Sequence, residues 1–143
     1  MTRGRPAYEL YEHTADTGIV LEAPTLPLLF ERAAAAMFDL IVDIERVGED
    51  GETETVELEE EDADLLLVSW LGELLGRAME RRRVYGRFDV RLDGVTRLRG
   101  RIWGEALDPE RHRYKTEIKA VTYHDLALRR TARGFQARVV FDL

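Results

Sequence analysis

The residues whose types and positions could do chemistry lie at the two ends of the chain. Residues 13–16 read His-Thr-Ala-Asp, and residues 141–143 read Phe-Asp-Leu. If the fold brings these ends together, the carboxylates of Asp16 and Asp142 and a backbone or carboxylate oxygen of Leu143 could hold a hard divalent cation, because such ions prefer oxygen ligands. The commoner alternative is that the two aspartates are ordinary surface charges, since sequence spacing cannot show that they approach each other.

Two further residues are candidate functional neighbours of this pair. His13 could be a metal ligand, a general base or a group that orients a ligand, although a histidine that is simply hydrogen-bonded at a strand end is commoner. Lys115 and Lys119 are the only lysines, which indicates that a compact ammonium is needed at one of these positions. Lys119 could equally be an edge-strand lysine that discourages aggregation.

No reaction is indicated by a local motif. The sequence has no Gly-rich phosphate loop, no Ser-His-Asp arrangement and no histidines at zinc-ligand spacing, so we assign no catalytic residue and expect the protein not to be an enzyme. A metal-dependent hydrolase that uses His13 and Asp16 is a weaker alternative, because no nucleophile or further set of ligands is visible.

Composition limits the remaining classes. A chain of 143 residues with 45% hydrophobic and 34% charged residues is typical of one globular domain, here residues 1–143. Because there is no cysteine, thiolate metal sites are excluded and any ion must use oxygen or imidazole ligands. The longest apolar runs are too short to cross a bilayer and no signal segment is present, so we expect a cytoplasmic protein without a membrane partner.

The net charge of −7 makes nucleic acid an unfavourable direct partner, because phosphate binding depends on clustered Lys and Arg. A basic protein partner fits better. The exception would be a local basic patch, for which residues 81–83, Arg-Arg-Arg, are the obvious candidate. Cations in the last turn of a helix complement the helix dipole, and we assign this run that role.

Hydrophobic periodicity predicts an α+β fold. The two helical segments carry an apolar stripe at helical spacing, and the remaining elements alternate apolar and polar residues as strands do. Because the strands cluster in the second half, we expect a two-layer sandwich with both helices on one face of a mainly antiparallel sheet. The predicted strands are 8–12, 18–22, 53–60, 88–92, 98–104, 116–123 and 135–142, and the predicted helices are 26–41 and 62–82.

Three details of this prediction concern individual residues. Thr25 is expected to cap the first helix, and Gly94 to supply the positive φ of a tight hairpin turn. Trp70 is interpreted as a packing residue rather than a ligand platform. In the last strand the apolar residues share one face, which places Asp142 on the opposite face.

Several blocks, in this order, resemble the archease family over nearly the whole chain. The first block is Tyr-Glu-His-Thr-Ala-Asp and the last is Phe-Asp-Leu, and 104–105 is similar to a mid-chain turn of the family. The matching blocks are residues 11–16, 36–38, 70–75, 104–105, 118–124 and 141–143.

The resemblance implies a non-enzymatic α+β protein that assists the RtcB-type tRNA-splicing RNA ligase by promoting its guanylylation and multiple turnover. It also implies that Asp16, Asp142 and Leu143 form a divalent-cation site, with calcium as the expected ion and magnesium or manganese as alternatives. Lys119 and His13 are then functional neighbours of that site. The alternative role in such a family is that of a chaperone-like modulator of an RNA methyltransferase or another RNA-processing enzyme.

Overall fold

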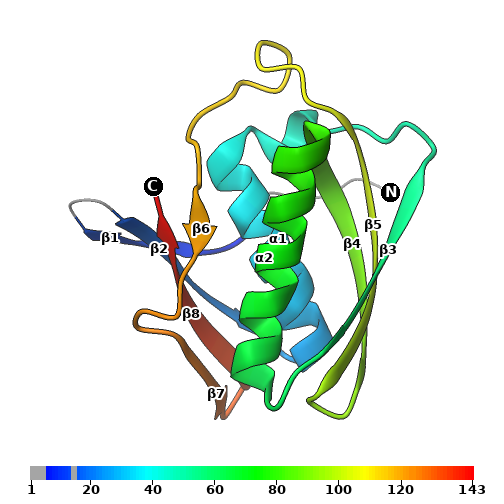
Figure 1. Ribbon diagram of the computed structural model, residues 1–143. Coiled ribbons are helices and arrows are strands. Elements are labelled where there is room, and N and C mark those ends of the chain that lie inside the picture. The colour runs from blue at the N-terminus through cyan, green and yellow to red at the C-terminus, as the bar shows by residue number, and fades with distance from the viewer. Residues whose placement is uncertain (1–5, 14–15) are drawn as a thin grey trace.

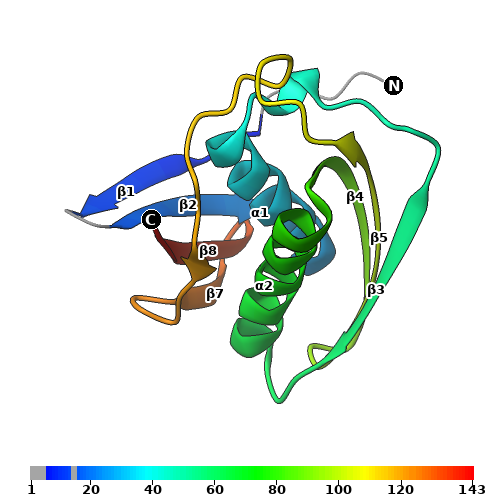
Figure 2. The ribbon, with the colours of Figure 1, turned by 45° about the horizontal axis from the view of Figure 1, so that its top comes forward.

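Two long helices lie between two antiparallel sheets in the computed structural model, which describes residues 6–13 and 16–143 (Figures 1 and 2). We call the sheet that contains the first and the last strand the terminal sheet, and the other the hairpin sheet. The helices are α1 (Leu26–Ile41) and α2 (Ala63–Arg81), and a short 3-10 turn, Ile44–Arg46, follows α1. None of the helices in the described residues is long and apolar enough to span a membrane.

In the terminal sheet the strand order is β1-β2-β8-β6, and β7 pairs with β8 beyond the end of β6. In the hairpin sheet β5 lies between β3 and β4. The strands of the terminal sheet are β1 (Glu9–His13), β2 (Asp16–Ala23), β6 (Ala120–Val121), β7 (Ala127–Thr131) and β8 (Gly134–Asp142). Those of the hairpin sheet are β3 (Thr53–Glu59), β4 (Arg83–Asp93) and β5 (Arg97–Ala106).

Local capping explains where the helices begin. The Thr25 side chain accepts a hydrogen bond from the Leu28 backbone N–H at 3.4 Å, and Asp62 accepts one from the Leu65 N–H at 2.9 Å. Each of these bonds satisfies an N–H group that the first turn of a helix leaves unpaired. α2 ends at Arg81, and Arg82, which caps it, has a left-handed φ of 53°. The predicted helix bounds are therefore confirmed to within a residue.

The core fills the space between the sheets and the helices. Trp70 is fully buried, and its Nε1 donates to the Phe30 carbonyl of α1 at 3.0 Å. The packing role predicted for this residue is confirmed. β4 and β5 approach closely at Gly104, where an added Cβ would lie 1.9 Å from the Val84 carbonyl oxygen. Only glycine fits there, and the expectation of a mid-chain turn at residues 104–105 was wrong, because both lie within β5.

The α+β class, the two long helices and the antiparallel pairing are as predicted, but the strands divide between two sheets. A period-2 pattern shows that a strand has a buried face without showing which sheet buries it. The helices therefore pack against both sheets, not on one face of a single sheet (Figure 2).

The prediction was wrong for residues 116–131. The strand expected at 116–123 shrinks to the two residues of β6, and the segment before it is tied to the end of α1 instead of to a sheet. The Lys115 N–H donates to the Ile41 carbonyl at 2.8 Å, and the Asp43 N–H to that of His112 at 2.9 Å. β7 was missed because this edge strand carries Arg129 and Arg130 on exposed positions, which obscure an alternating pattern.

Candidate functional site where β2 meets the end of β8

The strand register brings the two predicted aspartates next to each other. Asp16 of β2 pairs directly with Asp142 of β8, Asp142 pairs on its other side with Ala120, and Asp16 pairs with His13. Residues that are directly opposite in antiparallel strands project to the same face, with Cβ atoms about 4.5–5.5 Å apart. The two carboxylates therefore start from neighbouring positions in one row across the terminal sheet, beside the C-terminus (Figure 1).

This row lies on the outer face of the sheet. Ala137, Val139 and Phe141 of β8 are buried in the core, so the alternation of the strand turns Asp142 outward. Asp142 is exposed and Asp16 is partly exposed. The predicted face is confirmed, and both carboxylates are accessible to a ligand from solvent.

The structure distinguishes the two lysines. Lys115 is a structural residue: its Nζ donates to the Asp39 carbonyl at 2.8 Å and lies 3.7 Å from the Asp39 carboxylate. Lys119 has an exposed side chain, and its backbone N–H donates to the Asp142 carbonyl at 2.8 Å. Lys119 is therefore the lysine adjacent to the candidate site.

The structure shows the positions of Leu143 and of the His13 backbone, the other predicted parts of this site. Leu143 follows Asp142 directly, and its side chain packs against the core. His13 enters the row through its backbone pairing with Asp16. The prediction for the His13 side chain lies outside what the structure describes, and so do residues 14 and 15.

The donor set suits a hard cation that takes few protein ligands. Among the residues that the structure describes, no ion pair involves Asp16 or Asp142, and no three His, Asp or Glu side chains converge. Like charges directly opposite each other destabilise a sheet, and a cation between them would remove that repulsion. Two carboxylates, backbone oxygens near Leu143 and water make an oxygen-rich set of the kind that Ca²⁺ or Mg²⁺ uses.

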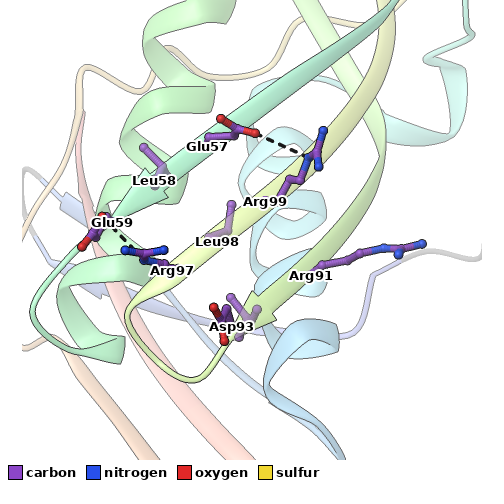
Figure 3. Close-up of a pocket in the computed structure, with 9 residues that line it drawn as sticks. Glu57, Leu58, Glu59, Arg91, Asp93, Arg97, Leu98 and Arg99 are labelled. Carbon is purple, nitrogen blue, oxygen red and sulfur yellow. Dashed lines mark ion pairs between the residues drawn. The ribbon is translucent and has the colours of Figure 1, made fainter.

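A hollow with a volume of about 540 Å³ lies elsewhere, on the hairpin sheet (Figure 3). Its charged lining is balanced, three arginines against three carboxylates, and two cross-strand ion pairs join Arg97 to Glu59 at 3.7 Å and Arg99 to Glu57 at 3.5 Å. Exposed pairs of this kind contribute little energy. With no net charge and no nucleophile or histidine in its lining, this hollow is a weaker candidate than the aspartate pair.

A strongly perturbed pKa also lies away from the site. Glu105 accepts hydrogen bonds from Arg111 at 3.0 Å and from the Gly48 N–H at 2.6 Å, and lies 2.8 Å from Nε2 of buried His112. The Arg111 hydrogen bond is the main cause that lowers the pKa of Glu105 to about 2, with His112 and Gly48 contributing. His112 accepts the Asp108 N–H through Nδ1 at 2.9 Å, which makes Nε2 the protonated nitrogen. This cluster joins β5 to the segment that follows it and has a structural role.

Sequence reasoning missed Asp39, a carboxylate that is only 4% exposed within the apolar stripe of α1. It accepts hydrogen bonds from the Tyr8 hydroxyl at 2.9 Å and from the Ile44 N–H at 3.3 Å, besides its contact with Lys115. The sequence signal that could have indicated its burial is the position of an acidic residue among the apolar residues of the helix. Asp39 anchors the segment that leads to Lys119.

Comparison with known proteins agrees with this architecture. The family model described as the Archease protein family matches residues 8–143. The protein archease of Pyrococcus furiosus is 42% identical, and that of Methanosarcina mazei 43%; each match covers 95% of this chain and 98% or 95% of the relative.

Solved structures show the same fold. The solution structure of a Methanobacterium thermoautotrophicum protein superposes with a TM-score of 0.76 at 31% identity, covering 95% of this chain and 98% of that one. The crystal structure of a Thermotoga maritima archease, described as a possible chaperone, gives a TM-score of 0.64 at 20% identity over 93% and 94% of the two chains. By the family match over residues 8–143 and the identity to its members, the chain belongs to the archease family.

Proposed function

We propose that this protein is a non-enzymatic activator of an RtcB-type tRNA-splicing RNA ligase in the cytoplasm, promoting guanylylation and multiple turnover of the ligase. Membership of the archease family supports the class of partner. The observation that carries the proposal is the direct cross-strand pairing of Asp16 with Asp142 on an exposed sheet face.

In this proposal Asp16, Asp142 and an oxygen of Leu143 hold one divalent cation. Calcium is the expected ion, and magnesium or manganese are alternatives, because a carboxylate and carbonyl donor set accepts all three. A bound cation would supply positive charge beside the nucleotide phosphates of the partner, and charge stabilisation is a main catalytic factor in such transfers.

Backbone contacts of the terminal sheet support the proposed cation site. β2 and β8 hold the two carboxylates side by side through backbone pairing, and the Lys119 N–H fixes the Asp142 carbonyl. The exposed Lys119 ammonium is available as a second positive group beside the same strand end. His13, paired with Asp16 by backbone register, is a candidate for orienting the Asp16 carboxylate.

The test is RNA ligation by a purified RtcB-type ligase from the same organism, in single-turnover and multiple-turnover conditions, with and without this protein. We expect wild type to stimulate both and Asp142→Ala to lose the stimulation. Glu22→Ala is the matched control, because Glu22 is an exposed acid on the same strand and face as Asp16 but at the other end of β2. Full stimulation by Asp142→Ala would refute the metal-site mechanism.

A second function is favoured by the description of the Thermotoga maritima structure as a possible chaperone. A chaperone-like modulator of an RNA methyltransferase or another RNA-processing enzyme would suppress aggregation of that partner. This suppression would not depend on Asp142. Lack of ligase stimulation by wild type, together with suppression of methyltransferase aggregation by both wild type and Asp142→Ala, would establish this function instead.

A further inference from the structure

A second surface feature lies where the end of α2 meets the segment between β5 and β6. It is a hollow of about 270 Å³ with an apolar floor, to which Phe38, Leu75 and Ile118 contribute. All three are at most 4% exposed, so the floor is the hydrophobic core itself. We call this the Met79 hollow, after the residue on its rim.

The rim of the Met79 hollow carries apolar side chains that the fold leaves open to solvent. Met79 is 58% exposed and Tyr114 is 44% exposed, and they are two of the five exposed large hydrophobic residues in the described part of the chain. Methionine and tyrosine are enriched in protein interfaces, and methionine adapts to varied partners. A volume of this size is below the usual range for small-molecule pockets and suits one large side chain.

The rim also carries Arg82, a charged residue whose side chain the fold does not pair within the described part of the chain. In the run of residues 81–83, Arg81 pairs with Glu54, and Arg83 pairs with Asp50 at 2.6 Å. Arg82 has no side-chain partner among the described residues, and its left-handed backbone places it at the exposed end of α2. The sequence predicts that all three arginines complement the dipole of α2, but Arg83 begins β4 and does not belong to the helix. The side chain of Arg82 is free to bind a ligand.

The Met79 hollow is connected to the candidate metal site through the chain. Ile118 is in its floor, and the next residue, Lys119, donates its N–H to the Asp142 carbonyl. Figure 1 shows the segment after β5 running down to β6 beside the C-terminus. A protein that occupies the hollow would therefore lie next to the aspartate pair.

We infer that the Met79 hollow is the anchor site for the ligase partner, an inference that rests on the proposed function. The occupant is a protein segment that inserts one large apolar side chain between Met79 and Tyr114 and sets an acidic side chain against Arg82. Glu117, which also lines the hollow, faces a basic side chain of the same segment. The anchor supplies affinity, whereas the aspartate pair acts on the chemistry of the partner.

The experiment measures the dissociation constant for the purified RtcB-type ligase by biolayer interferometry, together with single-turnover ligation at saturating protein. Met79→Lys and Arg82→Glu are each expected to weaken binding at least tenfold, with ligation restored when the variant saturates the ligase. Because both residues are exposed, their thermal unfolding temperatures should match wild type within about 2 °C.

Val95→Lys is the matched control. Val95 is another exposed apolar residue, 49% exposed, in the turn after β4, whereas the hollow lies at the start of that strand. It should bind as wild type does. Asp142→Ala should also bind as wild type does while losing stimulation.

Wild-type affinity in both Met79→Lys and Arg82→Glu would overturn the anchor site and leave the proposed function intact. Equal weakening in Val95→Lys would also overturn it, because the effect would then be non-specific. Absence of ligase binding by wild type would overturn the proposed function itself, and the anchor inference with it.

Discussion

Replacing Asp142 by asparagine should remove most of the stabilisation that calcium gives to this protein. The change keeps the size of the side chain and removes one of two like charges that face each other across β2 and β8. In the metal-free protein, loss of that repulsion should be neutral or slightly stabilising, because opposed like charges on a sheet are destabilising by only a fraction of 1 kcal/mol. In calcium the variant should lose the stabilisation that ion binding provides.

The magnitude follows from linkage. A ligand at 100 times its dissociation constant stabilises the folded state by about 2.7 kcal/mol if it does not bind the unfolded chain. An unfolding entropy of about 2.1 cal/mol/K per residue amounts to ~0.3 kcal/mol/K for a chain of 143 residues. Saturating calcium should therefore raise the unfolding temperature of wild type by about 9 °C, and that of Asp142→Asn by less than about 2 °C.

The assay is differential scanning calorimetry in chelator and in a calcium series, with calorimetric titration to obtain the dissociation constant. Glu22→Gln is the control, since it removes an exposed charge from the same sheet face and faces Gln136 instead of another acid. Its calcium response should equal that of wild type. Two results would refute the reasoning from the paired carboxylates. One is a calcium-dependent rise in unfolding temperature that is the same in Asp142→Asn as in wild type, and the other is a wild-type unfolding temperature that does not change with calcium.

Two further predictions concern the fold. Gly104→Ala should destabilise the protein by roughly 3 kcal/mol or more in urea unfolding, because its Cβ would overlap the Val84 carbonyl, whereas Gly76→Ala, in open space on α2, should stabilise it by up to ~1 kcal/mol. The stabilisation from Glu105, whose pKa falls from 4.5 to about 2 mainly through Arg111, is fully present above the unfolded pKa and is lost as the pH falls from about 4.5 through 2. Glu105→Gln should therefore lose less stability than wild type over that pH range in urea titrations, and an equal loss would contradict this assignment.

The boundaries of the helices could be read from the sequence because they depend on local chemistry. Thr25 and Asp62 cap their own helices within three residues, and the buried stripe of each helix repeats at a fixed spacing. β6 and β7 could not be read in the same way. Segment 107–119 bonds to the distant end of α1 at Ile41, and sequence patterns carry no information about such long-range partners.

The candidate site shows the same division. Residue types proposed Asp16 and Asp142 as a pair but left ordinary surface charges as the commoner alternative, and the resemblance of residues 11–16 and 141–143 to a known family favoured the pair. Alternation along the last strand did predict the outward face of Asp142, because side-chain direction in a strand depends only on local backbone geometry. The sequence did not show which of the two lysines lies beside the aspartate pair. The structure shows that Asp39 binds Lys115, which leaves Lys119 for this position.

For this protein, the sequence by itself determined the α+β class, the extent of both helices, the buried face of the last strand and membership of a family. Each of these depends on periodicity, on capping over a few residues or on ordered blocks that can be compared directly. Only the tertiary structure decided that the strands form two sheets, that Asp16 is directly opposite Asp142, and that Met79, Arg82 and Tyr114 surround one hollow. These features join residues far apart in the chain, and their positions are set by strand register and helix packing, which depend on the whole core.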